Sequence, residues 1–267
     1  MREKEVILHC HLFKNAGTTL DWALRRTFGD GFIDHRDDQK MRQDGIDYLS
    51  DFLSGSPAVR ALSSHHMPFM PEYKKPFHWL LLLREPISRV RSVYDFEAKQ
   101  PESSLGSKMA KKMDLSEYIT WRMQDNVPAV IKNFYVRYLC DIKNSEVKIN
   151  NLDIERAFQR LSLSNVLVGT VERFDESMVI FEESLKESFP EVDLAYVKQN
   201  IGSYKTDSPL SFLDDITPES RDLLLENNQF DKKLHKMVSE GQKNTIRDIH
   251  GFDDKLAAFR ERCNSLV

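Results

Sequence analysis

The sequence of 267 residues has only three cysteines, and they stand far apart at Cys10, Cys140 and Cys263. Three scattered thiols cannot form a disulfide framework or a cysteine-based zinc site. No apolar run approaches the roughly 20 residues that a membrane-spanning helix needs, and no Asn-x-Ser/Thr glycosylation sequon occurs. Because a strand pattern begins within a few residues of the start, we expect no signal peptide and a cytoplasmic location.

A surplus of positive charge is missing as well. Lys and Arg number 38 against 42 Asp and Glu, which gives a formal net charge of −4. Domains that bind nucleic acid in general carry a basic surplus, so we expect no nucleic-acid partner, whereas a local basic cleft stays compatible with this balance. Hydrophobic residues make up 40% and charged residues 30%, a composition typical of a globular protein with a sizeable core.

The sequence also lacks the usual nucleotide-triphosphate loop, G-x-x-x-x-G-K-[ST], in which the lysine comes last. A different loop is present. Val6–Leu12 is a mostly apolar run, Lys14–Thr18 is small and polar, and apolar residues then recur at helical spacing. A strand, a tight loop and a helix aim backbone N–H groups and a positive helix end at an anion.

This segment predicts a phosphate-binding loop in which the lysine adds a full charge and the threonines add hydroxyl groups. A turn with a purely structural role is the alternative at this point. The expected contacts are Lys14, Asn15, Ala16, Gly17, Thr18 and Thr19.

A second segment strengthens this interpretation. Phe77–Leu83 is strongly apolar and ends abruptly in Arg84-Glu85-Pro86. Proline suits the first position of a helix, so Arg84 is expected at the carboxyl end of a strand, where open α/β sheets bind ligands. Ser92 follows two turns into the predicted helix. An ion pair with a nearby carboxylate is the alternative role for Arg84.

Together the two segments resemble the phosphate sites of sulfotransferases that use 3′-phosphoadenosine 5′-phosphosulfate (PAPS), most closely the carbohydrate (family 2, heparan 2-O-type) branch. His11–Thr19 is similar to the family pattern H-x-x-K-x-x-G-T-[ST], with Ala16 where the family often has a second glycine. Arg84–Pro86, with Arg89 and Ser92, is similar to the family's site for the 3′-phosphate.

The resemblance continues along most of the chain. Four further segments match the family. In Ser64–Phe69, His66 takes the position of the family's catalytic base candidate, and Lys198–Thr206 resembles a loop that folds over the nucleotide. In that last segment the resemblance implies contacts from Asn200, Ser203 and Lys205, with a plain linker as the alternative. The four segments are Ser64–Phe69, Asn133–Leu139, Val168–Ser177 and Lys198–Thr206.

The resemblance implies transfer of a sulfuryl group from PAPS to a hydroxyl of a carbohydrate, which could be anionic. His66 would act as the base, Lys14 would stabilise the leaving phosphate, and Arg84 with Ser92 would hold the 3′-phosphate. The product would be 3′,5′-adenosine bisphosphate (PAP). No metal is expected, because the strand before Arg84 lacks the Asp that holds Mg²⁺ in nucleotide-triphosphate enzymes.

Other interpretations stay open at this stage. The animal relatives are Golgi membrane proteins, so a trimmed chain of that kind would belong in the Golgi lumen. A P-loop-type small-molecule kinase and a non-catalytic nucleotide- or glycan-binding module are the alternative functions.

Strand patterns alternate with helix patterns up to Val168, and helices dominate afterwards. This order predicts an α/β three-layer domain with a central parallel sheet whose middle strand comes first. The resemblance implies that this domain is P-loop-like and that residues 1–267 are a single sulfotransferase domain. Residues 207–267 form its helical C-terminal part. Residues 99–150 are a helical insertion and a candidate acceptor lid, for which a flexible surface loop over 99–126 is the alternative.

The sequence also predicts two particular helices and one solvated face. One helix is expected from Pro128 to about Leu139 and another, unbroken, from Thr217 to Gly241. The charged run from Asp34 to Asp38 is expected to form a solvated face.

Overall fold

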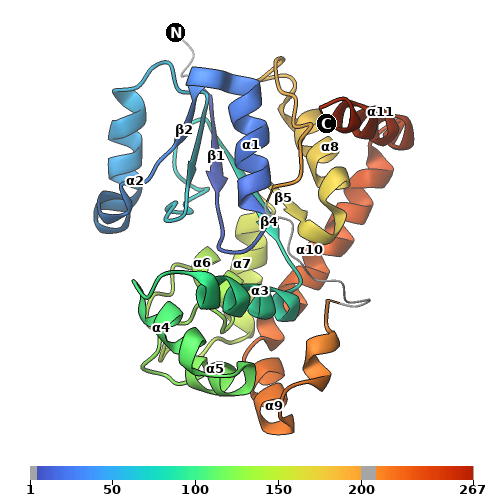
Figure 1. Cartoon of the computed structure of the whole chain (residues 1–267). Helices are drawn as coiled ribbons and strands as arrows, with labels where there is room; N and C mark the ends of the chain where they lie inside the picture. Colours follow the sequence, from blue (N-terminus) through green and yellow to red (C-terminus); the bar gives the residue numbers. More distant parts are fainter. Residues whose placement is uncertain (1–4, 200–208, 267) are drawn as a thin grey trace. The chain divides into compact units, whose positions relative to one another are not determined.

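The structure is a computed structural model that describes residues 5–199 and 209–266 (Figure 1). These residues form two compact units. The first unit contains residues 5–83, 159–199 and 238–266, and the second contains residues 84–158 and 209–237. The single domain predicted over 1–267 stays a prediction.

The first unit is built on a five-stranded sheet in which every strand pairs parallel with its neighbours. Its order is β2-β3-β1-β4-β5, so the first strand lies at the centre, as predicted. Buried apolar runs are typical of strands whose two faces are both covered. The strands are β1 (Val6–Cys10), β2 (Phe32–Asp34), β3 (Ala61–Ser64), β4 (Phe77–Leu83) and β5 (Val166–Thr170).

Helices flank this sheet and give the predicted α/β three-layer arrangement (Figure 1). On one face, Ile7 and Leu80 of the sheet belong to the same buried cluster as Leu24, Phe181 and Phe259 of three helices. Each such side chain contributes about 1.5–3 kcal/mol through removal from water. The helices of the first unit are α1 (Gly17–Phe28), α2 (Asp38–Ser54), α8 (Phe174–Leu185) and α11 (Phe252–Asn264), while α7 (Asn151–Leu161) and α10 (Gln229–Asp248) supply residues to both units.

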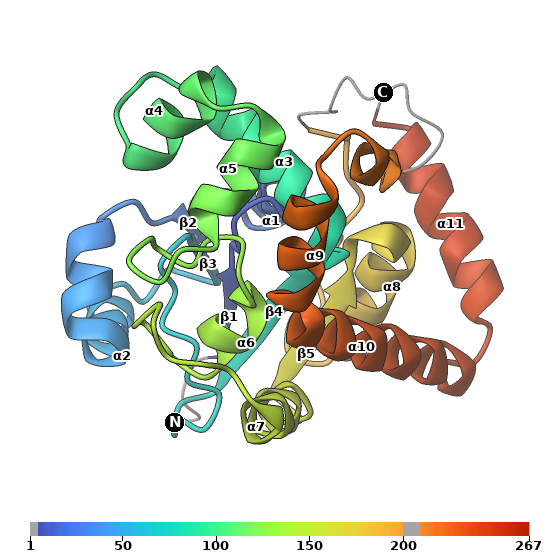
Figure 2. The same ribbon diagram turned by 90° about the horizontal axis from the view of Figure 1, so that it is seen from below.

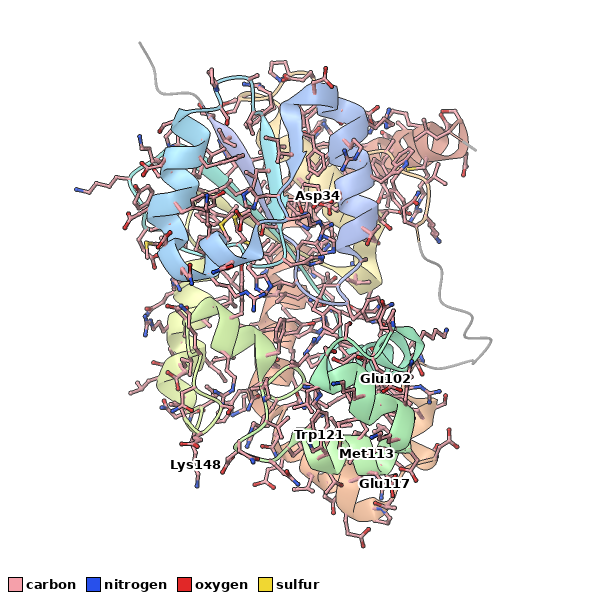
Figure 3. All side chains as sticks on the ribbon, turned by 60° about the vertical axis from the view of Figure 1, so that its left-hand side comes forward. Asp34, Glu102, Met113, Glu117, Trp121 and Lys148 are labelled. Carbon is pink, nitrogen blue, oxygen red and sulfur yellow. The ribbon has the colours of Figure 1, made fainter. Side chains whose placement is uncertain are left out.

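The second unit is helical, and Figure 2 shows its helices from below. Residues 105–122 form two helices, which excludes the flexible-loop alternative for that stretch. Capping boxes start both helices, one at Ser104 and one at Asp114, whose partner Glu117 is labelled in Figure 3. The unit consists of α3 (Pro86–Lys99), α4 (Leu105–Lys112), α5 (Leu115–Arg122), α6 (Phe134–Leu139), α9 (Pro218–Glu226) and the first part of α10.

The helix predicted from Pro128 is wrong in its first half, because α6 begins only at Phe134. Asn133 has a φ of 42°, in the left-handed region, which ends any helix that approaches from residue 128. Its side-chain oxygen accepts the N–H groups of Phe230 and Asp231 at the start of α10. The Asp231 carboxylate in turn accepts two backbone N–H groups from the first turn of α6.

The unbroken helix predicted from Thr217 is also wrong. The chain forms α9 and α10, which are separated at Asn227 and Asn228, and α10 continues through Gly241. Asn228 is buried, and its amide donates to the carbonyl of Leu224. A side chain that bonds its own preceding turn competes with the helix, and the new helix then begins on the Asn133 cap.

One further expectation needs correction. His35 in the charged run is buried, with Nε2 at 2.8 Å from the Tyr48 hydroxyl, so that run is a solvated face only in part. Among residues 5–199 and 209–266, none of the helices has the length and apolar character that a membrane span requires.

The segment Val168–Ser177 joins β5 to α8 through one buried hydroxyl. Ser177 Oγ accepts the N–H of Thr170 at 3.0 Å, and a Cβ atom on Gly169 would lie 2.4 Å from the same oxygen. Only glycine fits that close approach. This part of the sulfotransferase-like pattern therefore has a local structural role.

Candidate anion-binding site

The loop between β1 and α1 has an unusual backbone. Lys14 has a φ of 64° and Ala16 a φ of 57°, both left-handed, and they flank Asn15, whose φ is negative. Alternating backbone conformations of this kind turn successive N–H groups toward one concave side, which binds anions. The strain of two non-glycine residues in the left-handed region is typical of a functional turn.

Helix α1 begins directly after this loop, at Gly17. Its first turn contains no acidic residue, and the Ala16 side chain cannot cap it. The first N–H groups of a helix have no partner within the helix, and the helix dipole places partial positive charge there. The structure therefore brings the six predicted contacts, residues 14–19, together at the carboxyl end of the central strand.

Thr18 is exposed and Thr19 is buried within this turn. The Thr19 hydroxyl accepts the backbone N–H of Gln199 at 3.3 Å. The chain that leads into the predicted nucleotide-covering loop thus passes beside the phosphate-binding loop. The contacts predicted for that loop, Asn200, Ser203 and Lys205, lie outside the described residues.

A buried carboxylate lies beneath the loop and holds two histidines. Asp21 Oδ1 is 2.7 Å from His9 Nδ1, and Asp21 Oδ2 is 2.7 Å from His11 Nδ1. All three side chains are buried. Asp21 therefore accepts from both rings, in bonds short enough to be charge-assisted. We refer to His9, His11 and Asp21 as the histidine–aspartate cluster.

Asp21 and His9 were not predicted as site residues, although the sequence contains a signal for them. His9 and His11 are two residues apart in an extended segment, so they share one face of the sheet. Asp21 lies one turn after Gly17, on the side of the helix that meets the strand. A charged residue at that position, opposite two histidines, indicates a buried partner.

The electrostatics of the cluster favour an ionised Asp21. Burial alone would raise the pKa of this carboxyl, but the histidines' charges and hydrogen bonds outweigh burial and hold the pKa well below its usual range. For His11, burial is the largest influence and lowers the pKa, against the opposing bond from Asp21. The free protein at neutral pH therefore holds a neutral His11 beside an ionised Asp21.

His65 and His66 follow β3, and the structure places the first of them against the cluster. The His65 ring centroid is 4.1 Å from that of His11, and its Nδ1 donates to the His11 carbonyl at 3.1 Å. His66 is half-buried, and its backbone N–H donates to Ser64 Oγ. The role of His66 as the base stays a prediction, and His65 is a neighbour that the sequence analysis did not select.

Gly17 touches the cluster from the other side. A Cβ atom at this position would lie 2.2 Å from His11 Cδ2 and 2.5 Å from His11 Nε2. The glycine in the loop is therefore required by a close approach of an imidazole. The Nε2 edge of His11 faces the first residue of α1.

The histidine–aspartate cluster also has the side chains that ligate metals, with ligand atoms within 4.8 Å of one another. At 2.7 Å, however, each Nδ1 lies at the hydrogen-bonding distance from the carboxylate. A proton between nitrogen and oxygen accounts for each of these distances, so we interpret the cluster as hydrogen-bonded.

The predicted site for the 3′-phosphate begins at the residue after β4. The backbone of Arg84 is held on both sides by Tyr135, whose hydroxyl accepts the Arg84 N–H and donates to the Arg84 carbonyl. The Arg84 and Ser92 side chains are both half-buried. Arg89, another residue of the motif, is buried over the Phe134 ring at 4.3 Å and has a structural role.

Cations that could face an acidic acceptor divide into two groups. Arg60 and Arg137 are engaged within the fold, the first by Glu191 and the second by three backbone carbonyls. The lysines of α4 at 108, 111 and 112 are exposed.

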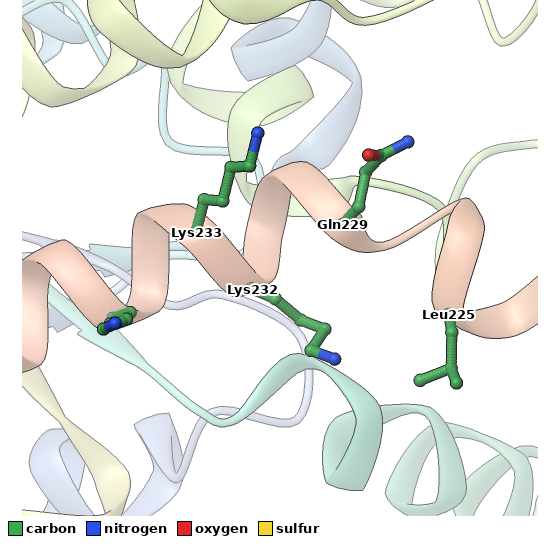
Figure 4. Close-up of a pocket in the computed structure, with 5 residues that line it drawn as sticks. Leu225, Gln229, Lys232 and Lys233 are labelled. Carbon is green, nitrogen blue, oxygen red and sulfur yellow. The ribbon is translucent and has the colours of Figure 1, made fainter.

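A shallow hollow of about 290 Å³ on α9 and α10 carries further lysines (Figure 4). Its lining residues are Leu225, Gln229, Lys232, Lys233 and Lys236.

Comparison with known proteins adds one relative. No protein-family model matches the chain. The chain is similar to an uncharacterized protein of Archaeoglobus fulgidus, with 27% identity over 245 residues that cover 88% of this chain and 90% of that protein. The similarity therefore extends over most of both chains.

Proposed function

We propose that this protein is a sulfotransferase that moves a sulfuryl group from PAPS to a hydroxyl of a carbohydrate and leaves PAP. The observation that supports it best is the loop between β1 and α1. Two left-handed residues, a lysine and an uncapped helix start meet there, at the carboxyl end of the central strand. Backbone donors with one cation suit the phosphosulfate end of the donor.

The roles of the loop residues follow from their chemistry. Lys14 would stabilise the charge that develops on the leaving phosphate. The backbone N–H groups of residues 16–18 and the hydroxyls of Thr18 and Thr19 would hold that phosphate, since the N–H groups of Asn15 and Thr19 already donate to the carbonyls of Leu12 and Ala16. Donors fixed before the reaction stabilise developing charge without a cost of reorganisation. The donor supplies the sulfuryl group, which passes to the acceptor in line with the leaving oxygen.

The proposed contacts elsewhere rest on the resemblance. Arg84 would bind the 3′-phosphate through its forked donors, and Ser92 would add a hydrogen bond. His66 would take the proton of the acceptor hydroxyl, since neutral imidazole is available near pH 7. Asn200, Ser203 and Lys205 would close over the nucleotide.

The proposed location and the proposed charge of the acceptor rest on the cysteines and the exposed lysines. The three cysteines are free thiols, as in proteins of reducing compartments, which supports a cytoplasmic location. The exposed lysines of α4 supply positive charge for an anionic carbohydrate. The proposal includes no metal and no nucleic-acid partner.

Arg84→Ala is expected to weaken PAP binding by about 10–150-fold, the loss of one or two bonds to a charged group at about 1.5–3 kcal/mol. Affinity for 5′-AMP, which lacks the 3′-phosphate, should stay unchanged. Isothermal titration calorimetry with both nucleotides measures the difference. Lys99→Ala is the control, since Lys99 is an exposed residue at the end of α3, the helix that follows Arg84. An equal loss for both nucleotides, or no loss for PAP, would contradict the assignment.

A further inference from the structure

We infer that His11 takes up a proton when an anion binds to the loop between β1 and α1, and that Asp21 is the positioning residue for this step. The inference rests on the anion site of the proposed function and deepens it. The proton comes from solvent and forms an N–H bond at Nε2 of His11. No bond of the ligand changes in this step.

The hydrogen bonds of the cluster determine which nitrogen is available. The ionised Asp21 carboxylate has no proton to donate. Its two 2.7 Å contacts therefore require a proton on Nδ1 of His9 and on Nδ1 of His11. In neutral His11, the lone pair is then on Nε2. Asp21 thus fixes the tautomer and the orientation of the ring.

The position of Gly17 determines what Nε2 faces. The space for a side chain on Gly17 is filled by the Cδ2–Nε2 edge of His11. Gly17 is the first residue of α1, where the first N–H groups have no acceptor within the helix and no side-chain cap; that of Thr19 donates to the Ala16 carbonyl. An anion bound by those groups would meet a lone pair in neutral His11 and an N–H donor in protonated His11. Anion binding therefore favours the protonated form.

The charged and titratable groups around His11 come from each neighbouring element. Burial lowers the pKa of His11 and of His65 in the free protein, so both start out neutral near pH 7. A bound anion opposes this effect, because an opposite charge nearby raises the pKa of a histidine. The groups that act on His11 are His9 of β1, Asp21 of α1, Arg36 after β2 and His65 after β3.

The sign of the pH dependence follows. The pKa of His11 in the complex lies above its value in the free protein. Protonated His11 therefore makes its full contribution to the affinity for the anion below the pKa that His11 has in the free protein. This contribution is lost as the pH rises through the pKa that His11 has in the complex. Affinity for the anion should fall as the solution becomes more alkaline.

The test is calorimetric titration of the full chain with PAP near pH 7 in two buffers of different ionisation enthalpy. The wild type should take up protons when PAP binds. His11→Gln should take up fewer, because the proton that His11 binds in the wild type is missing. The difference between them removes any proton exchanged by the phosphates of PAP. His250→Gln, at an exposed position outside the cluster, should match the wild type. Asp21→Asn, which frees the tautomer, should reduce the uptake.

A measurement on the unaltered protein covers the case in which a cluster variant fails to fold. Nitrogen chemical shifts of ¹⁵N-labelled histidine should show His11 as the Nδ1–H tautomer in the free protein and as the doubly protonated form with PAP. Binding of PAP with unchanged His11 shifts, or uptake that persists in His11→Gln, would overturn the inference. No binding of PAP by the wild type at any pH would instead overturn the proposed function.

Discussion

Lys14→Ala is expected to lower the rate of sulfuryl transfer by about 10²–10³-fold, the effect of removing one donor that stabilises developing charge. The lysine is half-buried in the strained loop, at the start of the row of backbone donors. Alanine adopts the same left-handed backbone at a similar cost, so the loop should keep its conformation. The charge is then the main property that the substitution removes.

The measurement is the release of PAP from PAPS with an acceptor polysaccharide on which the wild type turns over. Lys243→Ala, an exposed lysine of α10 in the same unit, should retain the wild-type rate. Both variants should unfold at the temperature of the wild type. A Lys14→Ala protein with normal turnover would remove Lys14 from the chemistry, whatever its effect on affinity.

Gly17→Ala is expected to reduce the free energy of unfolding by about 3 kcal/mol, the upper part of the range for overpacking, and to abolish measurable PAP binding. The new methyl group would overlap three atoms of the His11 ring, at 2.2, 2.5 and 2.7 Å. That ring cannot turn aside cheaply, because Asp21 holds it by a buried bond. Either the cluster or the start of α1 must move.

Gly241→Ala is the matched control for this substitution. Gly241 is exposed inside α10, and apart from the local helix backbone and the adjoining residues no atom lies within 4 Å of the Cβ that the change would add. It should stabilise the protein by up to about 1 kcal/mol, since alanine is the better helix former. Urea unfolding of the two variants should therefore give effects of opposite sign. Gly17→Ala with wild-type stability and affinity would show that the close approach of His11 does not matter.

Local sequence patterns were sufficient for the elements that position the site. The bounds of β4 and the start of α3 agree with the prediction to the residue, because an apolar run meets a proline that suits the first helical position. The central place of β1 also followed from the alternation of strands and helices. The loop between β1 and α1 was predicted from its lysine, glycine and threonines.

The features that sequence reasoning missed depend on contacts between distant residues. Asn133 and Asp231 cap each other's helices across almost 100 positions, and this exchange decides where α6 and α10 begin. The bond between Asp21 and His9 depends on the packing of α1 against the sheet. Neither pairing has a local pattern of its own.

The structure also separates the sulfotransferase-like motifs by role. Arg89, Asn133, Gly169 and Ser177 all lie in those motifs, and each one packs or caps within its own unit. These four residues therefore have structural roles. The proposed activity depends on the loop around Lys14 and on Arg84.

The most direct test of the proposed donor is a thermal-unfolding titration of the wild type with PAP, beside a titration with ATP and Mg²⁺. A ligand at about 100 times its Kd stabilises the native state by about 2.7 kcal/mol, which raises Tm clearly. The account predicts a rise with PAP and little change with ATP and Mg²⁺. A rise with ATP and Mg²⁺ alone would contradict it, and a kinase would replace the sulfotransferase.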